Sequence, residues 1–394
     1  MSTVNSKDIQ GNVYSVPTFT QGLNVNGTPI DSQVNLTEYY TGAGTPSAPA
    51  NGAVWYNGSI TQQYVNSAWQ TLTLTLAPVW YGSRGVYSGR GASNAINYIT
   101  IASPGNAADF GDLTVARGDV AALSNGSRGV FAGGTGLSNV IDYITVGSTG
   151  NATDFGDMLA AADQVSGCSN GPRGVIAGGF TATNTPQDVL QYITIATTGN
   201  ATDFGNLLSA IAGTGALSDG VKGVFGGGGT AGNPPSGFSN VVQYVAIATT
   251  GNATDFGDLT VARSEVAGAS SLSRGVFAGG YTGSTSNVMD YITIATTSNA
   301  TDFGDLTQSM RGVGASSDNT YAVFGGGSTS IANNDMDYIT IATAGNAVDF
   351  GNLLAASITD DAAGSTADSL TILVYGSEFK KGTADGRERS ITPS

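Results

Sequence analysis

The sequence contains no histidine and only one cysteine, Cys168, among its 394 residues. Histidine is the commonest general base and metal ligand, so its absence rules out Ser-His-Asp and Cys-His catalytic sites. A single cysteine forms no internal disulfide. Cys168 stands where other copies of a repeat have Leu123 or Ala269, which predicts a small core residue. No catalytic set is visible, so we expect no enzymatic activity, no metal site and no cofactor.

Positive charge is also scarce. The chain has 14 Lys and Arg against 29 Asp and Glu, a net charge of −15. Nucleic-acid phosphates and anionic lipid head groups bind clustered cations, so both are excluded as partners. No apolar run reaches the roughly 18 residues of a membrane span, and the start MSTVNSKDIQGNVYS does not resemble a secretory signal. We expect neither nucleic-acid binding nor membrane insertion.

Glycine is abundant, with 58 residues, and 40% of the chain is hydrophobic, which predicts a folded chain rich in tight turns. The dominant signal is an internal repeat with a period of 45 to 52 residues. A tyrosine within a segment such as YITIA recurs six times, and an Asp-Phe-Gly triplet begins eleven residues after each one. The tyrosines are Tyr98, Tyr143, Tyr192, Tyr244, Tyr291 and Tyr338, and the aspartates are Asp109, Asp154, Asp203, Asp255, Asp302 and Asp349.

Each repeat contains the pattern of four short strands. A small-residue strand such as 266–270 comes first, followed by a run such as RGVFAGG, the tyrosine strand and an outer strand around the Asp-Phe-Gly triplet. In the tyrosine strand Ile96 and Tyr98 face one way and Ile99 the other, so both faces of the sheet must be covered. Blades packed between neighbouring blades meet this need, with the small residues innermost. We expect the aspartate to bond nearby amides, the phenylalanine to fill the space between blades and the glycine to permit a turn.

The count of strands predicts how the ring closes. Six full repeats occupy about 84–361, and the two inner strands appear once more at 362–376. A strand pair at 53–74 could supply the missing outer strands. We therefore expect an all-β propeller over 51–378 with seven blades, closed by pairing of the N- and C-terminal strands. The alternative is a six-bladed ring with the N-terminal hairpin outside it.

The order Gly-Gly, tyrosine strand, then an aromatic residue before a leucine resembles the kelch repeat family of β-propellers. The resemblance covers about 76–376. The chain departs from that family in having phenylalanine, as at Phe110, where kelch repeats usually have tryptophan. The resemblance implies a propeller scaffold, and many kelch-like proteins are interaction adaptors.

Residues 1–50 do not repeat, and we expect an extended attachment arm and linker there. The segments GLNVNGT, at 22–28, and WYN…YV…WQ, within 55–70, resemble small modules of bacteriophage tail fibres, and the tandem YITIATTGNATDFGDL unit resembles propellers of marine phages. This implies a virion structural protein that contacts other virion proteins through its N-terminal arm. Residues 379–394 read as a polar tail. No heptad pattern specifies an oligomer, so a homo-oligomeric fibre is left open.

All length variation between repeats falls between the second and third strands. These segments are 88–95, 132–139, 177–188, 226–240, 278–287 and 325–335. Loops that vary on a constant scaffold often carry binding, and polar groups beside aromatic rings suit glycans or protein surfaces. The candidate binding residues are Phe180, Thr183, Asn233, Phe238, Tyr281 and Thr285.

Three functions fit these features. The first is a non-enzymatic virion protein, either a tail-fibre component or a decoration of the particle surface, that recognises a host glycan or protein. The second is an intracellular kelch-like adaptor for a protein partner. The third is a glycan-processing enzyme on a propeller, which has the least support because no catalytic residues are visible.

Overall fold

The computed structural model describes residues 83–88, 93–181, 185–232, 237–329 and 333–354 in full, and elsewhere only the backbone of the strands named below. Contacts divide the chain into two units, Met1–Ala77 with Ile372–Ser394, and Pro78–Thr371. In the described residues no helix is long and apolar enough to cross a membrane.

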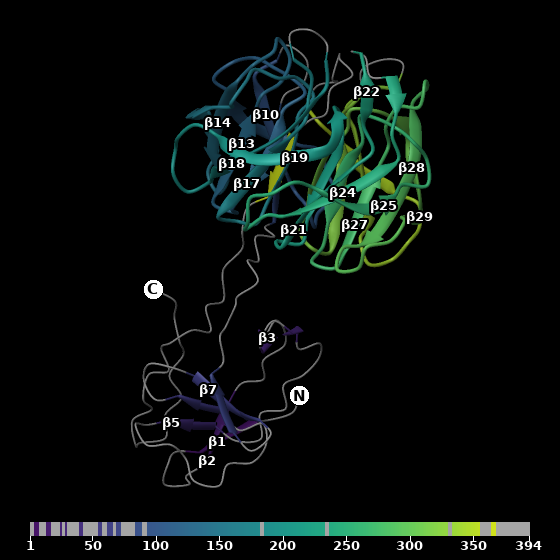
Figure 1. Ribbon diagram of the computed structural model, residues 1–394. Coiled ribbons are helices and arrows are strands. Elements are labelled where there is room, and N and C mark those ends of the chain that lie inside the picture. Colours follow the sequence, from purple (N-terminus) through teal and green to yellow (C-terminus); the bar gives the residue numbers. More distant parts are fainter. Residues whose placement is uncertain are drawn as a thin grey trace. The chain divides into compact units, whose positions relative to one another are not determined.

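The larger unit is a β-propeller of six antiparallel four-stranded sheets, here called blades 1 to 6 (Figure 1). From the innermost strand outward, blade 1 consists of β34 (Gly364–Ala367), β9 (Arg84–Ser88), β10 (Ala95–Thr100) and β11 (Ala108–Asp112). Blade 2 consists of β12 (Ala121–Ser124), β13 (Arg128–Ala132), β14 (Val140–Thr145) and β15 (Thr153–Asp157). Blade 3 consists of β16 (Ser166–Ser169), β17 (Arg173–Ala177), β18 (Gln187–Thr194) and β19 (Thr202–Ile211).

The other three blades repeat this order. Blade 4 consists of β20 (Gly215–Ser218), β21 (Lys222–Gly226), β24 (Val241–Ala246) and β25 (Thr254–Asp258), with an extra hairpin of β22 (Gly229–Ala231) and β23 (Ser236–Phe238). Blade 5 consists of β26 (Ala267–Ser270), β27 (Arg274–Ala278), β28 (Ser286–Thr293) and β29 (Thr301–Met310). Blade 6 consists of β30 (Gly314–Ser317), β31 (Tyr321–Gly325), β32 (Asp335–Thr340) and β33 (Val348–Asn352).

The structure confirms the propeller but not seven blades. C-terminal β34 pairs with β9, with Gly364 opposite Ser88 and Ala367 opposite Gly85, and so becomes the innermost strand of blade 1. The first repeat lacks its own innermost strand, and the last partial repeat supplies it. Across the junction between blades 6 and 1, the Tyr87 hydroxyl forms a hydrogen bond with Ser316 Oγ at 2.7 Å. The ring is therefore complete with six blades, and no further outer strands are needed.

The N-terminal hairpin belongs to a separate sheet of β5 (Tyr39–Thr41), β6 (Val54–Tyr56), β7 (Thr61–Val65) and β8 (Ala68–Thr71) and not to a blade, as in the six-bladed alternative. β6 pairs with β7 and also lies parallel to β5. The remaining strands of this unit are β1 (Val4–Lys7), β2 (Val13–Val16), β3 (Asn24–Val25) and β4 (Thr28–Pro29). β5 and β6, which lie on either side of residue 50, share a sheet, and the contact unit that holds the propeller begins at Pro78. The predicted second strand within 362–376 and the tail at 379–394 lie outside the described residues.

The core consists of side chains sandwiched between neighbouring blades. In β10, Ile96 and Asn97 point to opposite faces and both are buried, which confirms that the sheet is covered on both sides. In every blade the repeat tyrosine packs edge-on against the phenylalanine of the Asp-Phe-Gly triplet, as Tyr98 does on Phe110 with 6.0 Å between ring centroids. These phenylalanines are buried, as expected.

The glycine of the triplet is required by the neighbouring blade. At Gly111 the backbone has φ +147°, and a Cβ there would lie 2.4 Å from the carbonyl oxygen of Gly150 in blade 2. The pairing of β10 with β11 shifts register at this point, so Phe110 occupies a β-bulge. Close approach of two blades, rather than a turn, is therefore what excludes a side chain.

Adjacent blades are joined by an asparagine in the turn before the outermost strand. Asn151 Oδ1 of blade 2 accepts a hydrogen bond from the Asp112 amide of blade 1 at 3.1 Å. The same bond occurs at all six junctions, where the acceptors are Asn106, Asn151, Asn200, Asn252, Asn299 and Asn346. The aspartate of the triplet is exposed instead, and at Asp349 it accepts a bond from the Gly351 amide. We expected the aspartates of the triplet to bond nearby amides, but it is mainly the asparagines that do so.

Candidate functional site

The variable segments gather on one face of the propeller, called here the loop face. Its other components are the connections from each outermost strand to the next innermost strand. The two sets of loops are bonded together: the Gly134 amide donates to the Ala162 carbonyl at 2.9 Å and the Thr135 amide to the Gly118 carbonyl at 2.9 Å. The hairpin β22–β23 extends this face, and Figure 1 shows β22 at the upper edge of the propeller. Backbone hydrogen bonds between the variable loops and the connections therefore hold the loops in place.

The predicted site residues do not all reach the surface. Phe180 is fully buried and pairs through its backbone with Asp163 and Pro186, so its ring cannot contact a ligand. Thr183 and Asn233 lie outside the described residues. Thr285 is half-buried, and its backbone pairs with that of Tyr281.

Phe238 and Tyr281 are brought together, although 43 positions separate them. Both are half-buried, and their rings meet edge to face with 5.7 Å between centroids and an interplanar angle of 85°. Phe238 comes from the extra hairpin of blade 4, and Tyr281 from the loop of blade 5. Sequence reasoning placed both on the binding face without predicting this contact.

Arg311 and Glu265 complete this group and were not predicted from the sequence. The Arg311 guanidinium lies over the Tyr281 ring, 4.4 Å from its centroid, and its Nε is 3.6 Å from Glu265 Oε2. Arg311 is 15% exposed and Glu265 2%. We call Phe238, Tyr281, Arg311 and Glu265 the aromatic cluster. Its sequence signal is Arg311, which stands in the connection entering blade 6 where the other repeats have Gly118, Asp163, Ala212 and Ser264.

Glu265 occupies a strained backbone position near the innermost strands. Its φ of +54° is in the left-handed region, where the neighbouring repeats have Gly213 (φ +62°) and Gly312 (φ +60°). The Glu265 amide donates to the Gly213 carbonyl at 2.7 Å, and the Gly312 amide donates to the Glu265 carbonyl. A chain of backbone hydrogen bonds therefore links consecutive connections and holds the Glu265 backbone in place.

Two buried ion pairs lie below the loop face. Arg117 Nη1 donates to Asp142 Oδ2 at 2.8 Å, and Arg263 Nη1 to Asp290 Oδ2 at 2.6 Å, and all four side chains are fully buried. Each Nε also donates to a backbone carbonyl, that of Gly133 or Gly279. Because no solvent reaches these pairs, we assign them to the scaffold.

Arg117 and Asp142 are one version of a contact found at every junction. A polar residue directly precedes the repeat tyrosine and bonds the loop of the preceding blade; Gln191 Oε1, for example, accepts from the Leu159 amide at 2.8 Å. These residues are Asn97, Asp142, Gln191, Gln243, Asp290 and Asp337. A polar residue recurring at a buried position was the sequence signal for this contact.

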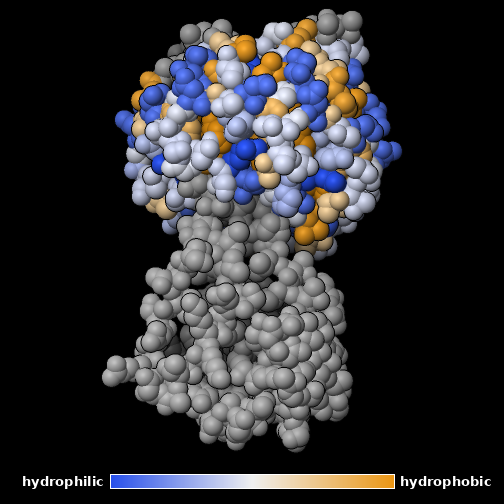
Figure 2. Space-filling model, turned by 90° about the vertical axis from the view of Figure 1, so that its left-hand side faces the viewer, coloured by the Kyte–Doolittle hydropathy of each residue, from blue (hydrophilic) through white to orange (hydrophobic). Residues whose placement is uncertain are grey.

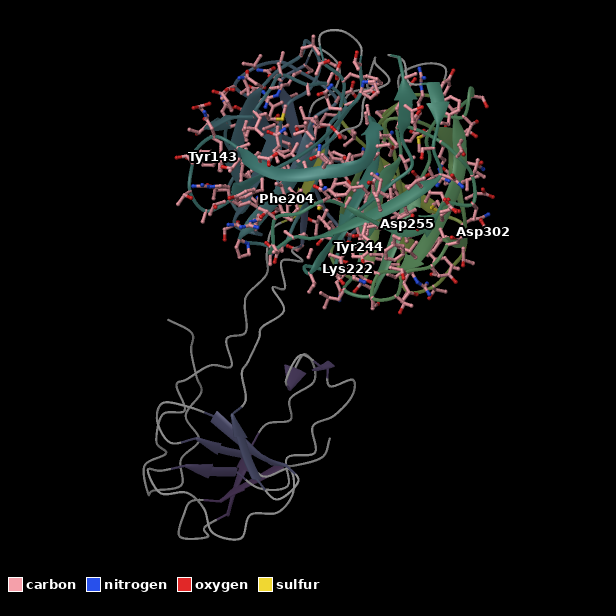
Figure 3. All side chains as sticks on the ribbon, viewed as in Figure 1. Tyr143, Phe204, Lys222, Tyr244, Asp255 and Asp302 are labelled. Atoms are coloured by element: carbon pink, nitrogen blue, oxygen red, sulfur yellow. The ribbon has the colours of Figure 1, made fainter. Side chains whose placement is uncertain are left out.

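The opposite face carries the turns between the first and second strands and is called here the turn face. Each of the first five repeats has Arg or Lys at the start of its second strand, and this cation lies over the repeat tyrosine, as Lys222 does 5.2 Å from the Tyr244 centroid (Figure 3). Lys222 Nζ also donates to the Ile294 carbonyl of the next blade at 2.9 Å. Among the described residues, Arg311 is thus the one cation of the loop face that is not fully buried.

Two of the described titratable groups have pKa values raised by burial. Burial raises the pKa of the Cys168 thiol well above its usual range, which favours the inert thiol form, as expected for a small core residue. Burial likewise raises the pKa of Tyr87. In the part of the chain that the structure describes, no group of three His, Cys, Asp or Glu could hold a metal ion.

The visible surface carries apolar residues in small separate groups among polar ones (Figure 2). Val115, Leu159 and Leu208 are exposed: the first two follow the outermost strands β11 and β15, and Leu208 lies within β19. No protein-family model matches the chain, and no curated protein matches it. The structure thus defines a six-bladed β-propeller with a cluster of aromatic and charged side chains on its loop face, and the kelch resemblance stays a prediction.

Proposed function

We propose that this chain is a non-enzymatic structural protein of a bacteriophage particle, a tail-fibre or surface component that recognises the host surface. The N-terminal residues attach to other virion proteins, and the propeller carries the recognition face. The N-terminal sequence motifs support the assignment to a virion, and the polarity of the propeller supports the assignment of the two faces.

The observation that carries the proposal is where the chain enters and leaves the ring. β9 begins at Arg84, and β34 ends at Ala367, which lies opposite Gly85. Both ends are on the turn face, because the other ends of these strands, Ser88 and Gly364, lie toward the loop face. Both connections therefore leave the propeller from the turn face, and we assign recognition to the loop face.

The composition of the loop face supports recognition. Its loops differ in length and sequence while the bonds that hold them recur, which is the arrangement that lets binding vary on a constant scaffold. The net charge of −15 disfavours strongly anionic partners. A neutral glycan or a protein on the host surface fits these properties.

Mass spectrometry of purified virus particles tests the assignment. Peptides of this chain should be present in particles at a stoichiometry matching other structural proteins, and they should persist through density-gradient purification. Detection of the chain in infected-cell lysate but not in particles would overturn the virion role and favour an intracellular adaptor. The control is a non-structural protein of the same virus, which should be lost on purification.

A further inference from the structure

The aromatic cluster is built from three consecutive blades. Phe238 belongs to the hairpin of blade 4 and Tyr281 to the loop of blade 5, while Arg311 belongs to the connection that enters blade 6. Two half-buried rings at 85° form a corner with apolar faces. Among the described residues of the loop face, this is the place where partly exposed aromatic rings adjoin.

The corner is held rigidly. The Tyr281 amide donates to the Ser264 carbonyl at 2.7 Å, and the Ser264 amide donates to the Tyr281 carbonyl at 3.0 Å. The Arg311 backbone is paired in the same way with Ser328. Rings whose backbone is already fixed lose little conformational entropy on binding, so the cluster is preorganised for a ligand.

The charges of the cluster decide the class of ligand. The Arg311 guanidinium stacks on Tyr281 and is 3.6 Å from the buried Glu265 carboxylate, so its positive charge is offset within the protein. A carboxylated or sulfated ligand would compete with Glu265 for Arg311 and would meet a net charge of −15. A ligand without charge encounters neither penalty.

Exposed residues that neighbour the two aromatic residues along the chain carry hydroxyl groups. Thr282 and Ser284, on the same loop as Tyr281, are exposed, and Thr230 on the adjoining hairpin carries an exposed hydroxyl. Sugar rings present apolar C–H faces and hydroxyls at their edges. Aromatic faces flanked by small polar groups match both features of a sugar ring.

We propose that the aromatic cluster is a binding site for a neutral saccharide, with a sugar ring packed against Phe238 and Tyr281. The inference rests on the proposed function, because it specifies the ligand of the same loop face. It makes Phe238 and Tyr281 the direct contacts and Arg311 a residue that positions Tyr281.

The test uses the full chain on an array of neutral oligosaccharides and of sialylated, uronate-containing and sulfated ones, followed by calorimetric titration of the best binder. We expect neutral saccharides to bind in preference to the acidic ones. Tyr281→Ala and Phe238→Ala should each weaken binding by at least about tenfold. Tyr281→Phe retains the ring and should retain binding.

Tyr321→Ala is the matched control, because Tyr321 is also half-buried and edge-on to another ring, that of Tyr338, but starts β31 on the turn face. It should leave binding unchanged, and circular dichroism with thermal melting should show that all variants are folded. Absence of binding to any neutral saccharide, preference for acidic ones, or unchanged binding in both alanine variants would overturn the site.

Failure of the site and failure of the virion role are distinguishable. A chain that is found in particles but binds no neutral saccharide loses the site and keeps the virion role. A chain that binds neutral saccharides through Tyr281 and Phe238 but is absent from particles keeps the site and loses the virion role.

Discussion

Asn106 Oδ1 of blade 1 accepts a hydrogen bond from the backbone amide of Asn352 in blade 6, at 3.0 Å and 246 positions away in the sequence. This bond lies where the ring closes, and the same bond joins each of the five remaining pairs of adjacent blades. Next to it the Gly105 amide donates to the Phe350 carbonyl at 2.7 Å. The sixth and first blades are therefore packed like consecutive ones.

Asn106→Ala tests closure with six blades. Removing the acceptor should lower the free energy of unfolding by about 1 kcal/mol, because the Asn352 amide loses its partner. Asn200→Ala, which removes the same bond inside the repeat array, is the reference and should cost a similar amount. Urea unfolding measures both. An effect for Asn200→Ala and none for Asn106→Ala would mean that the ring is open at this junction.

The buried ion pair of blade 2 can be replaced by groups from another blade of the same chain. Arg117→Ile alone should destabilise the protein by about 3–5 kcal/mol, because Asp142 then lies buried without its cation. The junction of blades 3 and 4 has a neutral version of this contact, in which the Leu208 amide donates to Gln243 Oε1 at 2.7 Å. Its residues Leu208, Ile211 and Gln243 are equivalent to Thr114, Arg117 and Asp142.

The triple variant Thr114→Leu, Arg117→Ile, Asp142→Gln should therefore recover most of the stability lost in Arg117→Ile. Thermal and urea unfolding at neutral pH provide the comparison. A triple variant no more stable than the single one would show that the ion pair of blade 2 cannot be exchanged for the neutral contact of blade 4.

Most of the fold could be predicted from periodicity. The alternation in β10 and the constant spacing from Tyr98 to Asp109 depend only on strand geometry, so they identified the strands and their order. The number of blades could not be derived in this way, because it depends on which strand completes blade 1. Both the N-terminal hairpin and Gly364–Ala367 were available in the sequence, and only the three-dimensional pairing with β9 distinguishes them.

The candidate site was predicted only in part, for a similar reason. Phe180 and Tyr281 occupy equivalent positions after Gly-Gly, yet Phe180 is buried and Tyr281 is half-exposed. The difference depends on contacts with neighbouring loops that vary in length. Glu265 follows Ser264, whose backbone pairs with Tyr281 within blade 5. Arg311 lies in the connection that enters blade 6, so its position over Tyr281 follows from the circular arrangement of the blades and not from local sequence.

Gly111→Ala tests the close approach between blades. A methyl group there would lie 2.4 Å from the Gly150 carbonyl oxygen at a backbone φ of +147°, so the variant should lose at least about 2 kcal/mol of stability. Gly147→Ala is the matched control, since nothing lies within 4 Å of its added Cβ, and it should change stability by no more than about 0.5 kcal/mol. Equal melting temperatures for the two variants would contradict the packing described for blades 1 and 2.

Asp337 is the third aspartate in the series of polar residues that precede the repeat tyrosines, and it differs from Asp142 and Asp290 in its environment. The place of Arg117 and Arg263 is taken by Met310, and the Thr307 amide and hydroxyl donate to the Asp337 carboxylate at 2.9 and 2.7 Å. Burial raises the pKa of Asp337, the bonds from Thr307 lower it, and the charges of Asp349 and Asp335 raise it further, so that the net shift is upward.

This shift fixes the direction of a pH effect. A carboxyl group whose pKa is higher in the folded than in the unfolded state binds more protons when folded. Its contribution to stability is therefore present below the unfolded value of about 3.9 and is lost as pH rises through the folded pKa. Asp337→Asn cannot titrate, and Asn97 shows that an amide is accepted at this position in blade 1. The melting temperature of Asp337→Asn should therefore rise relative to wild type between pH 4 and pH 7.

Asp142→Asn is the contrast, because it leaves Arg117 buried without its anion and should be the less stable protein at pH 7. A constant difference between Asp337→Asn and wild type across this pH range would show that Asp337 has the same protonation behaviour in the folded and unfolded states.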